Sequence, residues 1–313
     1  MTIRLLVIAG PTAVGKTRLG VEVAHALGSE ILSADSRQVY RGLDMGTGKD
    51  LEEYAAVDPP VPYHLIDIVE PREIYTLFRF QQDCYEVIRQ LAEKSGYGSG
   101  RVPLVMVGGS GLYVEAVVRD YRITDVPGDP ELRQQLSQQS RDDLVERLRQ
   151  TDPNLAARTD LSSRERVIRA LEIAEAGHRG PVKTSEPLGL DLECRIYAVR
   201  IDRGILRRRI RTRIEDRLAG GMVDEVRDLL DRGLTHDRLK KLGLEYREVG
   251  AYLAGHKTRH QMVDDLATTI GRFAKRQETW FRGMERRGTP IEWIEPGDAE
   301  RILKDVAEWV DGS

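Results

Sequence analysis

The sequence predicts an α/β fold, a parallel sheet flanked by helices, with a helical subdomain inserted into it. Over roughly the first hundred residues, short apolar runs alternate with helical patterns, which is typical of a parallel sheet. A stretch of about 85 charged, helix-like residues then separates the fourth expected strand from the fifth. With 313 residues, 40% of them hydrophobic, the chain can form one large domain and a smaller one.

The expected strands are short apolar runs, in the order 5–9, 30–34, 64–68, 104–107 and 193–201. Helices are expected where apolar residues recur at helical spacing, at 16–27, at 78–94 and from residue 202 nearly to the end. The turn at Pro127-Gly128 and the loop 177–189 bound the inserted segment. We therefore expect a core of residues 1–119 and 189–313 and an insertion of residues 120–188.

Composition excludes several classes of protein. The 48 Lys and Arg residues and 51 Asp and Glu residues give a net charge of −3, so any nucleic-acid contact must come from local basic patches. Cys84 and Cys194 lie far apart, which argues against a zinc module and predicts free thiols in a reducing cytosol. Because the sequence has no long apolar run and no signal-peptide pattern, we expect a soluble cytoplasmic protein without a membrane partner.

The first expected strand leads into a glycine-rich turn. This turn matches the phosphate-binding pattern G-x-x-x-x-G-K-[ST] and consists of Gly10, Pro11, Thr12, Ala13, Val14, Gly15, Lys16 and Thr17. A buried strand, a glycine turn and a helix direct backbone N–H groups and the positive end of the helix dipole at one point, where a phosphate fits. Lys16 would reach the outer phosphates, and the Thr17 hydroxyl would hold Mg²⁺. The sequence therefore predicts a P-loop NTPase-like sheet.

An acidic residue follows the second expected strand. Asp35 stands at the carboxyl end of this strand, next to the phosphate loop, where open α/β sheets bind their ligands. It could hold the magnesium ion indirectly or act as a general base toward a nucleophile. An aspartate that only stabilises a turn is an equally good interpretation, so this residue alone decides nothing.

A second turn of small residues, 108–113, follows the fourth strand and reaches the same edge of the sheet. Its glycines could let a ligand approach closely, with Ser110 offering a hydroxyl, or they could serve only the dihedral angles of a tight turn. This strand ends in Gly108 rather than in an acidic Walker B residue, and the chain has no N-K-x-D sequence. Motor ATPases and switch GTPases are therefore disfavoured.

Two arginine-rich segments are candidates for binding phosphates. The first contains Arg203, Arg207, Arg208, Arg209, Arg211, Arg213 and Arg217. At helical spacing Arg209 and Arg213 share a face, and so do Arg213 and Arg217; such a face suits a diphosphate or an RNA backbone, although a solvated helix explains most of the seven. The second segment, 272–287, mixes basic residues with Phe273, Trp280 and Phe281, a pattern that can bind RNA or reflect ordinary packing.

Taken together, the motifs resemble the tRNA dimethylallyltransferases. The resemblance rests on the phosphate loop, on Ser33-Ala34-Asp35-Ser36 with Tyr40, on Asp44-Met45-Gly46-Thr47-Gly48-Lys49, on Gly108-Gly109-Ser110-Gly111-Leu112-Tyr113, and on Arg166, Arg169-Ala170-Leu171-Glu172, Lys275-Arg276-Gln277 and Thr279-Trp280-Phe281-Arg282. It spans nearly the whole chain and is closest to the bacterial form, which has no zinc finger. It implies transfer of a dimethylallyl group from dimethylallyl diphosphate to N6 of the adenine next to the tRNA anticodon, position 37.

The resemblance also implies roles for individual residues. Asp35 would accept the N6 proton, Ser110 would lie near the diphosphate and the adenine, and Arg213 would bind the diphosphate and stabilise its developing charge. The phosphate loop would hold the diphosphate with Mg²⁺ on Thr17. The tRNA would contact Asp35, Ser36, Arg37 and Gln38, and in the insertion Glu165, Arg166, Val167, Ile168 and Arg169. The adenine must leave its stack to reach such a site, and we expect the enzyme to be a monomer.

Two segments depart from the family pattern. Glu245 occupies a glycine position, and residues 180–185 replace a Gly-Lys-Pro-Leu-Ser segment. Both are expected at the RNA surface, where Glu245 would repel phosphates or pair with an arginine such as Arg247. The alternatives from other classes are a small-molecule or nucleoside-monophosphate kinase and a non-catalytic RNA-binding paralogue.

Overall fold

The computed structural model describes residues 2–94 and 96–311. It divides the chain into two compact units. One unit runs up to Asp120 and resumes at Leu188, and the other comprises Tyr121–Pro187. The first is called the core unit here and the second the insertion.

In the described part of the core unit, six parallel strands form one sheet in the order β3-β2-β4-β1-β5-β6. Their bounds are β1 Thr2–Ala9, β2 Ile31–Ser33, β3 Tyr63–His64, β4 Leu104–Gly108, β5 Asp191–Val199 and β6 Glu292–Ile294. The central strand β1 is buried from Ile3 to Ala9 because both faces of the sheet are covered. The sequence prediction of a parallel α/β fold is confirmed.

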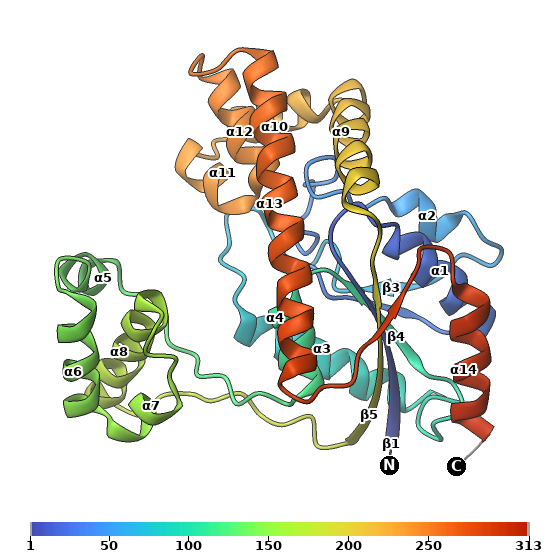
Figure 1. Cartoon of the computed structure of the whole chain (residues 1–313), viewed down its shortest axis with the longest axis horizontal. Coiled ribbons are helices and arrows are strands. Elements are labelled where there is room, and N and C mark those ends of the chain that lie inside the picture. Colours follow the sequence, from blue (N-terminus) through green and yellow to red (C-terminus); the bar gives the residue numbers. More distant parts are fainter. Residues whose placement is uncertain (1, 95, 312–313) are drawn as a thin grey trace. The chain divides into compact units, whose positions relative to one another are not determined.

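Side chains of β1 alternate between two hydrophobic clusters, one on each face of the sheet. Leu6 and Ile8 pack in the cluster that contains residues of α1 and α14, whereas Leu5 and Val7 pack in the cluster that contains residues of α3, α4 and α13. Figure 1 shows these helices on the two sides of the strands. The helices of the core unit are α1 Lys16–Leu27, α2 Leu51–Ala55, α3 Leu77–Ala92, α4 Gly111–Val118, α9 Arg203–Ala219, α10 Met222–Asp231, α11 His236–Leu242, α12 Leu244–Leu253, α13 Arg259–Arg286 and α14 Ala299–Asp311.

Two sequence predictions about the strands were wrong. The strand expected at 64–68 ends at His64, because Leu65 and Asp67 adopt the left-handed φ values of 65° and 56° and turn the chain away from the sheet. The chain is also not helical throughout its last part, since β6 adds a short edge strand beside β5. This strand has only three residues, too few to show an alternating pattern.

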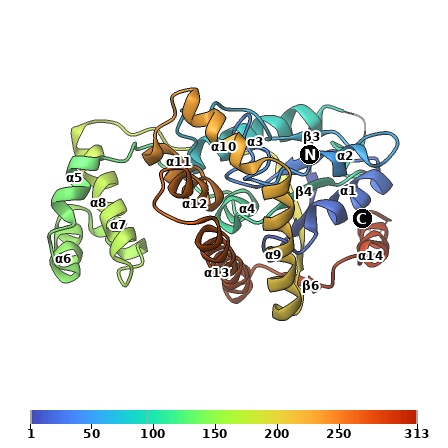
Figure 2. The same cartoon turned by 90° about the horizontal axis from the view of Figure 1, so that it is seen from above.

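The insertion consists of helices α5 Pro130–Leu136, α6 Arg141–Thr151, α7 Pro153–Arg158 and α8 Arg164–Arg179, seen in green to yellow-green in Figure 2. Each begins after a residue whose side chain accepts a hydrogen bond from a first-turn N–H group, namely Asp129, Ser140, Asp152 and Ser163. Leu136, Leu144, Leu148 and Leu171 are fully buried in a separate hydrophobic cluster. The insertion therefore has a core of its own.

Candidate functional site

The phosphate loop connects β1 to α1 and has the backbone that the sequence predicts for an anion site. Ala13 and Gly15 adopt positive φ values of 65° and 91°, and α1 begins at Lys16 directly after the loop. The Lys16 ammonium donates to the carbonyl of Pro11, 3.3 Å away, so it folds back over the loop. Burial lowers the pKa of Lys16, although Asp35 acts in the opposite direction. A bound anion would supply the charge partner that this lysine needs.

Two cavities of the core unit meet at the phosphate loop. The first, of about 260 Å³, is lined by residues of the loop, of α9, α12 and α13, and by Asp35, Ser36 and Ser110. The second, of about 870 Å³, is lined by the loop, by residues 49–53 and by α9. Lys16, Thr17, Arg213 and Arg217 line both cavities. A ligand with an anionic end could therefore place that end at the loop and extend into the first cavity.

The surroundings of Asp35 are compatible with both interpretations that the sequence left open. Its Oδ1 atom accepts a hydrogen bond from the backbone N–H of Arg37 at 2.8 Å, which is the turn-stabilising role. It also lines the first cavity, and its Oδ2 atom accepts no hydrogen bond from the described residues. One carboxylate oxygen thus orients the side chain while the other stays available to a ligand.

Ser110 joins the loops that follow β2 and β4. Its hydroxyl oxygen accepts a hydrogen bond from the backbone N–H of Ser36 at 3.1 Å, and it lines the first cavity just before α4 begins. Because β2 and β4 are neighbouring parallel strands, their carboxyl ends bring these residues to one edge of the sheet.

The glycines around Ser110 have a third explanation that neither sequence interpretation included. Gly108, Gly109 and Gly111 have no positive φ. A Cβ atom on Gly109 would collide with the Gln277 side chain, and one on Gly111 would collide with the Trp280 ring. Gly109 and Gly111 therefore allow α13 to approach the edge of the sheet, whereas Gly108 allows a close approach of Ala34.

Helix α9 contributes Arg208, Arg209, Arg213 and Arg217 to the second cavity, and the last two, spaced one helical turn apart, also line the first. Arg213 forms an ion pair with Asp50, and Arg217 forms one with Glu245, at 3.7 Å between Nη1 and Oε1. Glu245 lines the first cavity and burial raises its pKa. The proposed alternative partner Arg247 was wrong, because Arg247 lies against Glu248.

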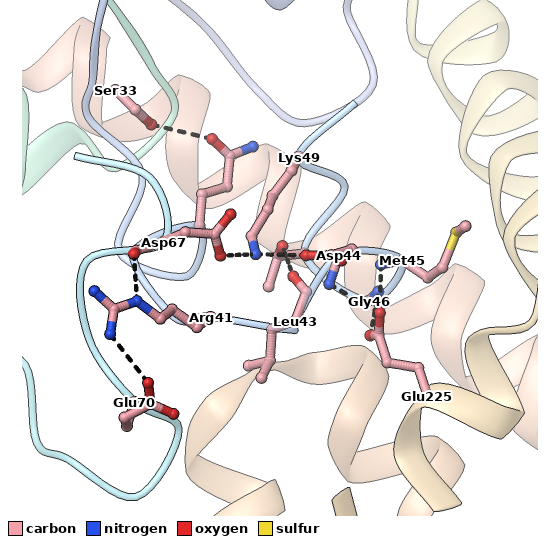
Figure 3. A network of polar contacts seen from close by, with 12 residues as sticks. Ser33, Arg41, Leu43, Asp44, Met45, Gly46, Lys49, Asp67, Glu70 and Glu225 are labelled. Carbon is pink, nitrogen blue, oxygen red and sulfur yellow. Dashed lines mark hydrogen bonds and ion pairs between the residues drawn. The ribbon is translucent and has the colours of Figure 1, made fainter. Parts of the chain in front are cut away.

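The segment between β2 and α2 is held in place by charged side chains, of which Lys49 is buried (Figure 3). The Glu225 carboxylate on α10 accepts hydrogen bonds from the backbone N–H groups of Asp44, Met45 and Gly46, at 2.8 to 3.1 Å. Lys49 is only 1% exposed and pairs with Asp44 and Asp67. The preceding residue, Gly48, has a φ of 60°, and a Cβ atom there would collide with Arg217 and lie 2.9 Å from the Arg213 guanidinium. The segment thus supports the arginine pair.

Two of the residues expected to contact tRNA near Asp35 use the polar ends of their side chains to bind the protein itself. Arg37 donates to the carbonyl of Lys241 at 2.6 Å, and the Gln38 amide donates to the carbonyl of Gly48 at 3.0 Å. Both side chains also line the first cavity.

In the insertion, the residues expected to contact tRNA differ in exposure. Glu165 and Arg166 are exposed, and Arg166 pairs with Asp160. Arg169 donates to the carbonyl of Val126 at 2.6 Å, and Ile168 is partly buried against the small core. Val167 is fully buried in that core. As a correction to the sequence prediction, the Val167 side chain has no surface to offer RNA in this structure.

Sequence reasoning missed Gln277, although it noted the surrounding sequence. The Gln277 side chain accepts a hydrogen bond from the N–H of Thr12 at 2.9 Å and donates to the carbonyl of Gly109 at 2.8 Å. It therefore connects the phosphate loop to the turn after β4. A buried amide in the otherwise basic stretch 272–287 was the available signal. In the same stretch Phe281 is core, whereas Phe273 and Arg276 stack on each other and line the first cavity.

Oxygen ligands for a metal are present but few. Thr17 lines both cavities, Asp35 lines the first and Asp50 the second. Among the described residues no group of three or more His, Cys, Asp or Glu side chains could hold a metal ion. This donor set fits Mg²⁺ bound chiefly through phosphate oxygens and water, which is how proteins usually hold it.

Cys84 and Cys194 are free, as the sequence predicts. No helix in the described part of the chain is long and apolar enough to cross a membrane.

Comparison with known proteins gives consistent matches over the whole chain. The family model described as IPP transferase matches residues 38–284, and the one described as isopentenyl transferase matches residues 2–56. The chain is 49% identical to tRNA dimethylallyltransferase 2 of Syntrophotalea carbinolica, over 94% of this chain and 95% of that protein. It is 47% identical to tRNA dimethylallyltransferase 1 of Geotalea uraniireducens, over 98% of this chain and 97% of that protein.

Solved structures agree. A full-length tRNA isopentenylpyrophosphate transferase from Bacillus halodurans is 32% identical, with a TM-score of 0.69, over 99% of this chain and 97% of that chain. A eukaryotic dimethylallyltransferase acting on tRNA is 19% identical, with a TM-score of 0.74, over 99% of this chain and 80% of that one, and this likeness concerns the fold alone.

Proposed function

Since the chain belongs to the tRNA dimethylallyltransferase family, we propose that it transfers a dimethylallyl group from dimethylallyl diphosphate to N6 of adenine 37 in tRNA and releases diphosphate. One observation supports this most directly. A single cavity is lined by Lys16 of the phosphate loop, by Arg213 and Arg217, and by Asp35, whose Oδ2 atom accepts no hydrogen bond from the described residues. A kinase would share the loop, but the comparisons favour the prenyl transferase.

The diphosphate would bind to the backbone N–H groups of the loop, to Lys16 and to Arg213. As the bond between N6 and the allylic carbon forms, the bond from that carbon to the diphosphate oxygen breaks, and the electron pair leaves with the diphosphate. Lys16 and Arg213 stabilise this developing charge, which is the kind of contribution that raises rate rather than affinity alone. Thr17 would hold Mg²⁺, which neutralises part of the charge on the diphosphate.

Asp35 would take the proton that N6 loses. Its Oδ1 atom is already fixed by the N–H of Arg37, so Oδ2 is the oxygen left to face the amine. Ser110 lies next to Ser36 and would help to position the extruded adenine or the diphosphate. Ser36, Arg37 and Gln38 would contact the RNA beside the target base.

The insertion would bind the tRNA through exposed residues such as Glu165 and Arg166, with Arg169 beside them. We further propose that the enzyme acts as a monomer in the cytoplasm. Replacing residues 121–187 with a short Gly/Ser linker tests the first point. We expect loss of salt-dependent tRNA binding in a gel-shift assay while pyrophosphate still raises the melting temperature of the core; retained tRNA affinity would contradict this division of roles.

The decisive experiment for the reaction uses dimethylallyl diphosphate labelled in the alkyl group, unmodified bulk tRNA and Mg²⁺, with γ-labelled ATP as the rival donor. We expect label from the alkyl group in RNA and none from ATP. Phosphoryl transfer from ATP without alkyl transfer would instead establish the kinase.

A further inference from the structure

Arg217 is a nearly buried cation whose hydrogen-bonding capacity is unused. Its side chain is 14% exposed, yet its guanidinium donates no hydrogen bond to any described residue. Its ion pair with Glu245, at 3.7 Å, is too long for a hydrogen bond. A guanidinium has five N–H donors in a fixed planar arrangement, and those of Arg217 face the two cavities rather than acceptors of the protein. This side chain is therefore prepared for a ligand.

The position of Arg217 restricts what that ligand can be. The residue lines both cavities, as Lys16, Thr17 and Arg213 do. Its guanidinium and that of Arg213 both lie against Gly48, so two positive charges are held side by side. Burial and the neighbouring Arg213 lower the pKa of Arg217, which indicates that the nearby carboxylates do not fully compensate its charge. An anion with several negative oxygens fits such a pair.

Glu245 explains how the second arginine is tolerated in the absence of a ligand. It comes from the first turn of α12, where the family pattern has glycine, and its side chain is only 18% exposed. Because the pair is long and lacks a hydrogen bond, Glu245 offsets the charge of Arg217 without occupying its donors.

We propose that Arg217 is a second guanidinium ligand of the diphosphate, beside Arg213, and that Glu245 balances its charge and orients it before the ligand binds. The proposal rests on the proposed function, because it takes dimethylallyl diphosphate as the ligand. Two arginines contacting one diphosphate would hold both phosphoryl groups and would neutralise the leaving group as the allylic carbon–oxygen bond breaks.

The test measures binding of inorganic pyrophosphate and of dimethylallyl diphosphate by calorimetry with Mg²⁺ present. We expect Arg217→Gln to raise the dissociation constant of both ligands roughly ten- to a hundredfold, the value of a lost charge-assisted contact. Arg217→Lys should recover only part of the affinity for these ligands because lysine lacks the planar arrangement of N–H donors. The matched control is Arg207→Gln, which removes the same charge from an exposed position of α9 that lines neither cavity.

A further variant guards against misfolding. Arg217→Gln leaves Glu245 without its partner, so the double variant R217Q/E245Q removes both charges and should bind pyrophosphate as weakly as the single variant. Affinities equal to that of Arg207→Gln in both variants would overturn the proposal. So would a loss confined to tRNA binding, which would assign Arg217 to an RNA phosphate. These measurements do not depend on the transfer reaction. If the unsubstituted protein did not alkylate tRNA, while Arg217→Gln still weakened pyrophosphate binding, only the proposed function would be refuted.

Discussion

The phosphate loop and the arginine pair border the same cavities but are held in place in different ways. The loop is built from consecutive residues, with the dihedral angles of Ala13 and Gly15 and the start of α1 setting its shape. The arginine pair on α9 is set by partners far away in the sequence, Asp50 and Glu245, and by the segment that contains Gly48. The shape of the first region is set mainly by neighbouring residues, although Gln277 connects it to α13, whereas the second depends on tertiary contacts throughout.

This difference predicts different responses to substitution. Changes in and next to the loop should impair chemistry or binding and leave stability nearly intact, because few distant residues depend on the ligand-facing groups. Changes among the supports of the arginine pair should lower stability and diphosphate affinity together, even at residues that line neither cavity.

Among the changes in and next to the phosphate loop, Asp35→Asn should have the largest effect. The amide keeps the size and can still accept from the N–H of Arg37, but it cannot take the N6 proton. We expect single-turnover transfer to fall by roughly 10² to 10⁴, with tRNA affinity and melting temperature nearly unchanged. Asp142→Asn, at an exposed position of the insertion, is the control. Unchanged turnover would leave Asp35 as a turn residue only.

Among the changes to the residues that support the arginine pair, Glu225→Ala should have the largest effect. It removes one carboxylate from three backbone N–H groups and from the hydroxyl of Tyr246, which donates to it at 2.7 Å. We expect the free energy of unfolding in urea to fall by about 2–4 kcal/mol. Pyrophosphate affinity should fall as well, although Glu225 lines neither cavity. If stability fell but affinity did not, the segment would not support the arginines as we infer.

The same division explains what the sequence could predict. The phosphate loop, α1 and the position of Asp35 follow from neighbouring residues, and the structure has the predicted elements there. Asp50 and Gln277 reach the site through contacts between residues far apart in the chain, for which spacing gives no signal. Helical spacing did place Arg217 on one face with Arg213, but it could not predict the pairing of Arg217 with Glu245. The early end of β3 has a similar cause, because Asp67 pairs with the buried Lys49 of another segment.

Gly48→Ala tests the support of the arginine pair without removing a charge. A Cβ atom at this position collides with Arg217 and crowds Arg213, in addition to the strain of a positive φ. We expect pyrophosphate affinity to fall about tenfold as the two guanidinium groups are displaced, a shift of about 1.4 kcal/mol. Gly42→Ala is the matched control, since its φ of 66° is similar but its nearest neighbour would be the Arg232 guanidinium at an ordinary 3.6 Å. Equal losses of affinity in the two variants would reduce the effect to backbone strain.

The smallest expected effect is that of the deprotonation of Lys16 on pyrophosphate affinity, and it appears only at alkaline pH. Because burial lowers its pKa below 10.5, Lys16 should lose its proton, and the loop its cation, at a lower pH than an ordinary lysine would. Pyrophosphate affinity of the unsubstituted protein should therefore decline at alkaline pH, at a lower pH than the ordinary lysine value of 10.5 would require, relative to Lys16→Met, which has no such group to titrate. Stability changes in the opposite sense: since the pKa in the folded state lies below that in the unfolded state, deprotonation of Lys16 favours folding, and the free protein gains a small stability increment as pH rises.

Calorimetric titrations of the two proteins across the alkaline range, with Lys304→Met at an exposed position of α14 as control, separate the ionisation of Lys16 from the ionisation of pyrophosphate itself. Parallel pH curves for the unsubstituted protein and Lys16→Met would mean that Lys16 keeps its proton, and that the acidic groups facing the loop outweigh its burial.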